Sequence, residues 1–236
     1  MAVFVLVHGG SHGGWCYQKV ARLLQAAGHV VYTPTLTGLA DRKHLLTPET
    51  DLETHVIDIA NLVEFEDLTD VILVGHSYGG MVITGAADRL PDRVGHRVYL
   101  DAAYPGNGES MMDCSPPALR EVIRQFVCVV DGVEGIVLPD NLHGVTDPAM
   151  LEWMRPRLTP HPWKSADQKL ALHREAEMRA IPESHIICVG TLGIRDLDAL
   201  KASSDGRVWI SDAGHDVMLI EPEWVVEKLE IIAAKS

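Results

Sequence analysis

The sequence predicts an α/β fold in which helices cover both faces of a parallel sheet. Short runs rich in valine and isoleucine alternate with stretches whose apolar residues recur at helical spacing. This alternation is typical of βα units, because parallel strands need a crossover segment between them. The chain has 236 residues, of which 47% are hydrophobic and 22% charged. This length and composition suffice for one sizeable core, so we expect a single domain over residues 1–236.

Six strands and four helices can be placed from these patterns. The strands are expected at residues 3–7, 29–33, 71–74, 97–100, 185–189 and 207–210. The first helix is expected at residues 15–27 and ends at Gly28, and the second follows Thr50-Asp-Leu-Glu53, which resembles a capping box. The third is expected at about residues 78–90, before Pro91, and the fourth from Glu221-Pro222 onward.

Residues 107–180 interrupt this alternation. They hold more than half of the prolines and show helical fragments rather than strands, one of which is expected to start at Asp147-Pro148. Strands resume only after this stretch. We therefore expect it to be a helical cap inserted into a core that consists of residues 1–106 and 181–236.

Charge and cysteine content exclude several classes of partner. The 20 basic and 33 acidic residues give a net charge of −13, and a chain without basic blocks is not expected to bind nucleic acid. No apolar run approaches the roughly 18 residues of a membrane span, and the apolar N-terminus lacks a basic region and a cleavage site. The four scattered cysteines are expected to be free thiols in a reducing compartment, which favours a cytoplasmic protein.

A serine between two glycines is the first candidate for chemistry. Gly75-His-Ser-Tyr-Gly79 follows an expected strand and opens an expected helix. The G-x-S-x-G turn is sharp, and glycines on either side of the serine remove side chains that would clash there. Such a turn holds the serine hydroxyl above the sheet edge and predicts that Ser77 is a nucleophile. The alternative is a glycine-rich turn without a catalytic role.

The loop after the first strand, His8-Gly9-Gly10, leaves backbone amides uncovered. Acyl transfer needs such amides for the developing oxyanion. We expect the amides of Gly10 and Tyr78 to form an oxyanion hole, whereas a plain glycine loop is the alternative. His8 and His12 have no carboxylate or thiol cluster near them in the sequence, so no metal or other cofactor is expected.

A serine hydroxyl needs an imidazole base, and a triad needs an acid that orients this base. Among the twelve histidines, only His215 follows the last expected strand, where its loop can return over Ser77. Asp101 ends the fourth strand and is the preferred acid. Asp196 and Asp198 lie beyond the fifth strand and are the alternatives, although Asp196 also suits a helix N-cap.

With these residues in place, the chain resembles the α/β-hydrolase superfamily over nearly its whole length. It is most similar to the branch of small esterases related to plant methylesterases and hydroxynitrile lyases. The resemblance implies a reduced sheet of six strands with the oxyanion loop after the first. The motifs that carry it are His8-Gly-Gly-Ser-His-Gly-Gly-Trp15, Gly28-His-Val-Val-Tyr-Thr-Pro34, Val74-Gly-His-Ser-Tyr-Gly-Gly-Met81 and Gly214-His-Asp-Val-Met-Leu219.

The sequence departs from this branch at two places. The plant enzymes resemble one another in an aspartate directly after the fifth strand, where this chain has Val189-Gly-Thr-Leu192. Many haloalkane dehalogenases place the acid after the preceding strand, and this analogy favours Asp101. Hydroxynitrile lyases carry a threonine at the place of Gly9 and a lysine at the place of Asp216. Because an aspartate is the wrong charge beside cyanide, lyase activity is disfavoured.

These observations predict a cofactor-free serine hydrolase that cleaves a small carboxylic ester, with lactones and thioesters as further substrates. The alternatives are a C–C bond hydrolase or hydroxynitrile-lyase-like enzyme with the same triad, and a non-catalytic ligand receptor on the same fold. A homodimer is compatible with the sequence. Large apolar residues of the cap are expected either to line the substrate pocket or only to pack the cap onto the sheet. They are Trp153, Met112 and Phe126, together with Met111, Met154 and Trp163.

Overall fold

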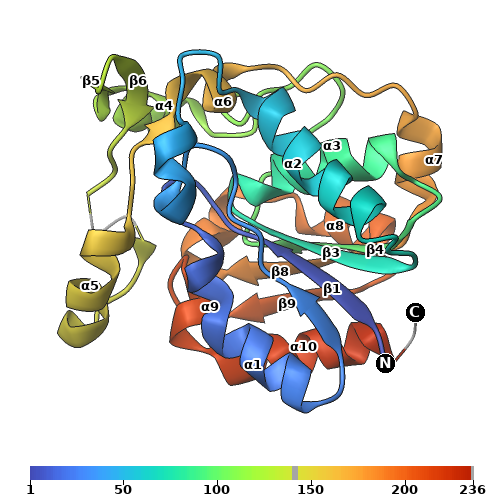
Figure 1. The fold of residues 1–236 in the computed structure, drawn as a ribbon. Coiled ribbons are helices and arrows are strands. Elements are labelled where there is room, and N and C mark those ends of the chain that lie inside the picture. The colour runs from blue at the N-terminus through green and yellow to red at the C-terminus, as the bar shows by residue number, and fades with distance from the viewer. Residues whose placement is uncertain (140–142, 235–236) are drawn as a thin grey trace.

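A parallel sheet runs through the middle of the computed structural model, which describes residues 1–139 and 143–234 (Figure 1). The six strands lie in the order β2-β1-β3-β4-β8-β9, and every pairing is parallel. The predicted sheet is therefore confirmed, with strand ends that differ from the expected ones by a few residues. The strands are β1 (Val3–Val7), β2 (Val30–Tyr32), β3 (Val71–His76), β4 (Val94–Leu100), β8 (Glu183–Cys188) and β9 (Val208–Ser211).

Helices cover both faces of this sheet, as expected (Figure 1). One face is covered by α1 (Gln18–Ala26), α9 (Val217–Ile220) and α10 (Pro222–Ala233), and the other by α2 (Leu52–Phe65), α3 (Gly79–Arg89) and α7 (Glu175–Ala180). The remaining elements of this part of the chain are the 3-10 helices η1 (Gly14–Tyr17), η2 (Ala40–Leu45) and η5 (Val189–Ile194) and the helix α8 (Leu197–Ser203).

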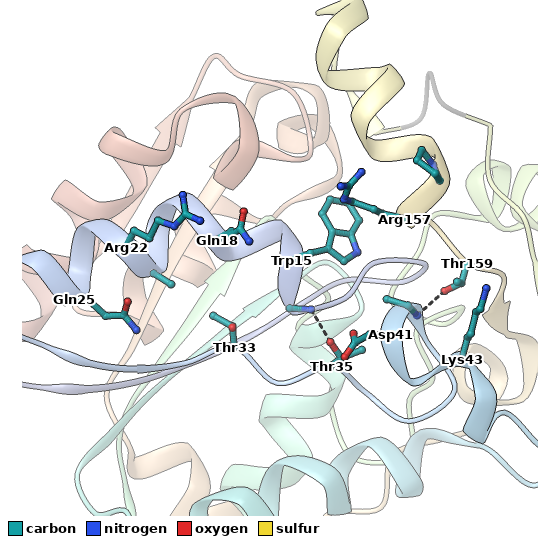
Figure 2. Close-up of a pocket in the computed structure, with 14 residues that line it drawn as sticks. Trp15, Gln18, Arg22, Gln25, Thr33, Thr35, Asp41, Lys43, Arg157 and Thr159 are labelled. Carbon is teal, nitrogen blue, oxygen red and sulfur yellow. Dashed lines mark hydrogen bonds between the residues drawn. The ribbon is translucent and has the colours of Figure 1, made fainter.

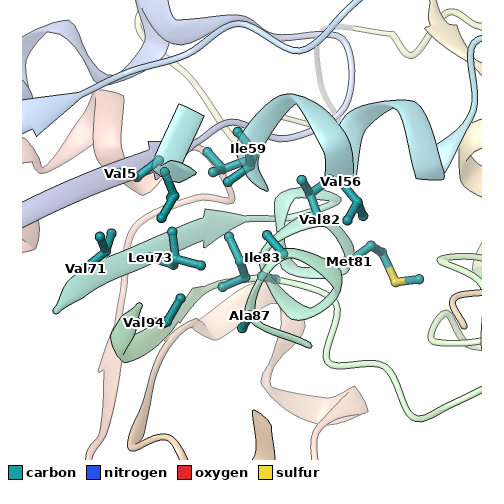
Figure 3. Close-up of a cluster of buried hydrophobic side chains, with 14 of the residues drawn as sticks. Val5, Val56, Ile59, Val71, Leu73, Met81, Val82, Ile83, Ala87 and Val94 are labelled. Atoms are coloured by element: carbon teal, nitrogen blue, oxygen red, sulfur yellow. The ribbon is translucent and has the colours of Figure 1, made fainter. Parts of the chain in front are cut away.

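The core between the sheet and the helices α2 and α3 is built from aliphatic side chains (Figure 3). Val5 and Leu73 project from β1 and β3 toward Ile59 of α2 and Val82 of α3, and all four are buried. A fully buried side chain of this size contributes about 1.5–3 kcal/mol through the hydrophobic effect. This packing holds α3, and with it the turn that precedes α3, firmly against the sheet.

The N-terminus of α2 is capped one residue later than the sequence suggested. Asp51 accepts a hydrogen bond of 3.0 Å from the amide of Thr54, and the Thr54 hydroxyl accepts one of 3.4 Å in return. Thr50 is not the cap because its hydroxyl accepts a hydrogen bond from the amide of Thr47. Glu53 pairs with Arg89 of α3 rather than with the helix end.

The residues between β4 and β8 contain helices, as expected, but they also contain an antiparallel sheet. The expectation of helical fragments rather than strands is therefore corrected. Asp131 and Gly132 join two of its strands with φ angles of 50° and 81°, which are the positive values of a two-residue hairpin turn. The elements are α4 (Pro117–Arg124), β5 (Val127–Val130), β6 (Val133–Ile136), α5 (Pro148–Met154), η4 (Arg155–Arg157), β7 (His161–Pro162) and α6 (Trp163–Asp167).

Four other expectations concern the whole chain. The four cysteines are free, as expected. None of the helices within residues 1–139 and 143–234 combines the length and the apolar character that a bilayer span requires. The cytoplasmic location and the division into a core and a cap at residues 107–180 stay predictions.

Candidate active site

Ser77 occupies a strained turn between β3 and α3. Its φ angle is 52°, a value that non-glycine residues rarely adopt. A Cβ atom on Gly75 would lie 2.5 Å from the carbonyl oxygen of Gly79, and one on Gly79 would lie 2.6 Å from the carbonyl oxygen of Val7. The turn can therefore form only with glycine at both places, which is the physical reason for the motif. It leaves Ser77 half-buried at the wall of a cavity.

Asp101 lies within hydrogen-bond distance of His215. It directly follows β4, and its Oδ2 atom lies 2.6 Å from Nδ1 of His215. Asp101 is buried, whereas the side chain of His215 keeps 26% of its surface exposed toward the cavity and solvent. Asp196 instead caps α8, where it accepts a hydrogen bond of 3.0 Å from the amide of Ala199. The geometry thus favours Asp101 over Asp196.

The second oxygen of Asp101 is also hydrogen-bonded. Its Oδ1 atom accepts from the amide of Cys188 at 3.1 Å and from the hydroxyl of Thr191. Burial alone would raise the pKa of Asp101, but the hydrogen bond and charge of His215, followed by the bonds from Thr191 and Cys188, lower it to about 2. Thr191 lies in the segment after β8 where the plant branch is expected to carry its aspartate. In this chain the segment supplies a donor to the acid.

The amides of Gly10 and Tyr78 are available to a ligand. Within the described residues, neither amide donates a hydrogen bond to the protein. Gly10 follows β1 and Tyr78 follows Ser77, so two separate loops contribute one donor each. A Cβ atom on Gly9 would lie 2.9 Å from Cβ of Ser77, and this close approach explains why the loop needs glycine there. An amide from each loop is what the predicted oxyanion hole requires, and the oxyanion hole stays a prediction.

Ser77, Asp101, His215 and Gly10 line one cavity of about 620 Å³. Its walls also include Thr191 and Cys188, together with buried and half-buried histidines. The rest of the lining comes largely from apolar side chains on the segments around α4 and β6 and on η5. These are Met111, Leu119, Ile123, Ile136, Leu138 and Ile194.

The three cap residues that were expected to bind substrate do not line this cavity. Met112 and Phe126 instead pack into a small apolar cluster with Ile123 and Ile136, because the antiparallel sheet must bury one of its faces. Trp153 packs edge-on against the indole of Trp15, with 5.3 Å between the ring centroids. We therefore no longer expect Trp153, Met112 and Phe126 to contact substrate. Met111, which was also considered, does line the cavity.

His161 is a site residue that the sequence analysis missed. It lies in β7, pairs with Ile136 of β6 and lines the cavity. Its ring centroid is 4.4 Å from that of Tyr78, and its Nε2 atom lies 3.0 Å from the hydroxyl of Ser165. Burial lowers the pKa of His161 well below the usual value, so its ring is neutral. The Asp131-Gly132 hairpin signal could have indicated the sheet that carries it.

A second group of titratable side chains lies beside the loops that carry Gly10 and His215. His12, His143 and Asp216 are buried, and one ligand atom of each lies within 4.8 Å of the others. The fold thus brings a carboxylate to His12 that its sequence neighbours do not supply. Nε2 of His12 lies 3.0 Å from Oδ2 of Asp216, which is a hydrogen-bond length. Two atoms bound to one tetrahedral zinc ion at ~2.0–2.1 Å would lie about 3.3–3.4 Å apart. We therefore interpret the contact as an ion pair.

A second hollow lies elsewhere on the described surface (Figure 2). It has a volume of about 720 Å³ and lies between α1, the loop after β2 and η4, with Trp15 and Arg157 on one side. Its charged side chains, such as Arg22, Asp41 and Lys43, are mostly exposed. Because neither Ser77 nor His215 lines it, the cavity that contains both residues is the candidate active site.

Comparison with known proteins identifies the family. Residues 4–228 match the model of the alpha/beta hydrolase family, and the chain belongs to this family. A carbendazim hydrolyzing esterase from Nocardioides sp. (strain SG-4G) is 39% identical over 241 residues, which cover 97% of this chain and 98% of that protein. Methylesterase 2 from Arabidopsis thaliana is 36% identical over 109 residues, which cover 45% of this chain and 41% of that protein.

Solved structures agree with this assignment of the fold. An extracellular alpha/beta-hydrolase from a Paenibacillus species has a TM-score of 0.84 at 24% identity and covers 97% of this chain and 98% of its own. Tomato methylketone synthase I has a TM-score of 0.81 at 20% identity, and the match covers 99% of this chain and 98% of that chain. The predicted fold and the predicted resemblance to the methylesterase branch are thus confirmed.

Proposed function

We propose that this protein hydrolyses a small carboxylic ester through an acyl-enzyme on Ser77. The observation that carries the proposal is the 2.6 Å contact between His215 and Asp101 in the cavity that Ser77 lines. A histidine whose Nδ1 atom is held by a buried carboxylate presents Nε2 as the base for a serine hydroxyl. The amides of Gly10 and Tyr78 supply the second requirement, which is stabilisation of the oxyanion.

The proposed reaction has two halves. His215 takes the proton of the Ser77 hydroxyl, whose oxygen forms a bond to the acyl carbon while the carbonyl electrons move onto the oxygen. The amides of Gly10 and Tyr78 hold this oxyanion until the bond to the alcohol breaks and His215 gives the leaving oxygen its proton. Water then repeats the sequence on the acyl-enzyme and releases the acid and free Ser77. Asp101 keeps His215 in the required tautomer throughout.

The esterase class rests on relatives as well as on geometry. The relative that spans nearly the whole chain is named as an esterase, and the Arabidopsis relatives are named as methylesterases. The protein is accordingly a carboxylic ester hydrolase. The apolar lining of the cavity favours an uncharged acyl or alcohol group of modest size. Carbendazim and small methyl esters are therefore the first substrates to assay.

The structure also weighs against the hydroxynitrile-lyase alternative. A threonine in place of Gly9 would bring its Cβ atom to 2.9 Å from Cβ of Ser77. Asp216, at the place of the lyase lysine, is buried and paired with His12. Neither position can therefore supply the groups that the resemblance assigns to the lyases.

Covalent labelling tests the proposal. A fluorophosphonate should add to Ser77 and abolish ester turnover, and peptide mapping by mass spectrometry locates the adduct. Ser77→Ala should fold normally and lose at least roughly 10³-fold in kcat, because the nucleophile is removed. Ser203→Ala, at an exposed serine outside the cavity, is the matched control and should keep full activity. An adduct on another residue, or release of no more than one equivalent of acid, would contradict the proposal.

A further inference from the structure

We infer that His12 and Asp216 form a charged positioning pair that fixes the oxyanion loop, defined as residues 8–12, against the loop that carries His215. The inference rests on the proposed function, because it assigns a purpose to the Gly10 amide in ester hydrolysis. Neither residue is placed among the groups that touch the reacting atoms. Their role would be to hold two groups that do.

The pair bridges segments that are far apart in the sequence. His12 belongs to the oxyanion loop, and Asp216 directly follows His215. Both side chains are buried, with 2% and 0% of their surface exposed. Nε2 of His12 lies 3.0 Å from Oδ2 of Asp216, and Nδ1 of His12 lies 2.8 Å from the carbonyl oxygen of Gly10.

These two contacts determine the protonation of His12. A carbonyl oxygen and a carboxylate oxygen both accept hydrogen bonds, so both ring nitrogens of His12 must donate, and only an imidazolium can do so. His29 shows the contrasting case in the same protein. Its Nδ1 atom accepts from the amide of Ala2 while its Nε2 atom lies 3.1 Å from a Glu230 oxygen, so a neutral ring satisfies both contacts.

The surroundings of His12 agree with a single positive charge there. Burial alone would lower the pKa of His12, but the charge and hydrogen bond of Asp216, followed by the Gly10 carbonyl, raise it. The indole of Trp15 stacks on the His12 ring, with 5.2 Å between centroids, and an aromatic face stabilises a cation. Within the described residues, the other titratable groups that face the pair are His8, Cys16, Tyr17, His76, His143, Cys188 and His215.

The neighbouring histidines differ from His12. Burial lowers the pKa of both His8 and His76 to about 3, so they are neutral and add no charge. His76 lies 3.8 Å from Asp216, and Nδ1 of His143 lies 3.7 Å from the same carboxylate. Both distances are longer than a hydrogen bond, so His12 is the main side-chain partner of Asp216.

The His12–Asp216 pair holds the backbone of the oxyanion loop at Ser11. Ser11 has a φ angle of 65°, a strained backbone conformation for a non-glycine residue that persists only where the surrounding structure holds it. The His12 ring holds the Gly10 carbonyl on one side of this residue, and the Ser11 carbonyl accepts a 3.0 Å hydrogen bond from Thr159. With the Gly10 carbonyl fixed, the Gly10 amide keeps its direction toward the oxyanion. A displacement of about 1 Å at such a donor can cost roughly 10²-fold in rate.

Kinetics of variants test this role. Asp216→Asn should lower kcat by roughly 10²-fold and change KM by less than about threefold, because the donor acts on the transition state. His12→Asn should do the same, and the double variant should lose no more than either single one. His29→Asn, which removes the histidine–carboxylate contact with Glu230, is the matched control and should keep kcat.

The pH profile gives a readout that a merely structural role would not move. In the wild type, kcat/KM should fall at alkaline pH as His12 loses its proton, above the range of an ordinary histidine. In Asp216→Asn the charge that contributes most to the raised pKa of His12 is gone and only the Gly10 carbonyl still opposes burial, so we expect His12 to be neutral in the assay range. That variant should be slow and should lack the alkaline fall.

A measurement on the wild type does not depend on the folding of variants. Imidazole ¹⁵N spectra should show both His12 nitrogens protonated at mildly alkaline pH, where an ordinary histidine is neutral. A neutral His12 ring, an Asp216→Asn variant with unchanged kcat and pH profile, or a bound metal ion that this substitution releases would each overturn the inference. In all three cases Ser77 would still be labelled, whereas an unlabelled and inactive wild type would instead refute the proposed function.

Discussion

Two aspartates compete for the position of triad acid in the sequence, and their surroundings separate them. Asp101→Asn should fold and lose roughly 10³–10⁴-fold in kcat, because an amide favours the wrong tautomer of His215. Asp196→Asn should cost less than about tenfold in kcat and about 1 kcal/mol in unfolding free energy through a weaker cap of α8. Steady-state ester hydrolysis and urea unfolding measure the two effects.

Asp101→Asn should also change how the stability of the fold depends on pH. Since the pKa of Asp101 is lowered to about 2, its ionised form stabilises the fold above the ordinary carboxylate range. This contribution is lost as pH falls through about 2, and Asp101→Asn should remove that part of the acid dependence. A larger loss of kcat for Asp196→Asn than for Asp101→Asn would reverse the assignment.

Residues with a motif could be predicted, and residues positioned only by tertiary contacts could not. Ser77 has a turn motif and His215 follows the last strand, so both were found among the residues that line the cavity. Thr191 and His161 gain their places because β8 ends beside Asp101 and β7 joins the antiparallel sheet. The sequence left two roles open for Phe126, because apolarity does not distinguish a cavity wall from a packed cluster.

At the scale of elements, the capping of α2 offers a direct test. Asp51→Ala should lower the unfolding free energy by about 1 kcal/mol, because the amide of Thr54 loses its acceptor. Glu53→Ala should cost less than about 0.5 kcal/mol, since its pair with Arg89 is exposed. Urea denaturation at neutral pH measures both. Equal or reversed costs would support a cap that involves Glu53, as the sequence first suggested.

Strands with a strong alternation signal were predicted, whereas short strands in the insertion were not. The six strands of the parallel sheet alternate with helices along the chain, and this alternation predicted them. β5 and β6 contain only 4 residues each, and prolines surround them. The Asp131-Gly132 pair between two valine-containing runs was the available signal, because this dipeptide favours a two-residue hairpin.

At the scale of the molecule, the parallel sheet assembles the candidate site. Ser77, Asp101 and His215 follow β3, β4 and β9, and the carboxyl ends of parallel strands meet at one edge of a sheet. The order of the strands could be inferred from the resemblance, but the shape of the cavity could not. Its walls depend on how the segment between β4 and β8 folds over that edge. The homodimer stays a prediction.

A buried ion pair links two neighbouring strands of the sheet. Arg97 of β4 and Glu183 of β8 are register partners, their charged groups are 2.8 Å apart, and both side chains are almost fully buried. The hydroxyl of Tyr104 donates a further hydrogen bond of 2.8 Å to Glu183. Burial would raise the pKa of Glu183, but the hydrogen bond from His185 and the charge of Arg97 lower it to about 2.

Removal of one partner should therefore be more damaging than removal of both. Glu183→Gln should lower the unfolding free energy by about 3–5 kcal/mol, because Arg97 is left charged and uncompensated in the interior. A double variant with Arg97→Met and Glu183→Leu should recover most of this loss.

The wild type should lose the stabilisation that the ionised Glu183 provides as pH falls from about 4.5 through about 2, whereas Glu183→Gln should show no such loss. Glu227→Gln, at an exposed carboxylate of α10, serves as the control in urea unfolding across pH. If Glu183→Gln unfolds at the wild-type urea concentration, the pair does not hold β4 and β8 together.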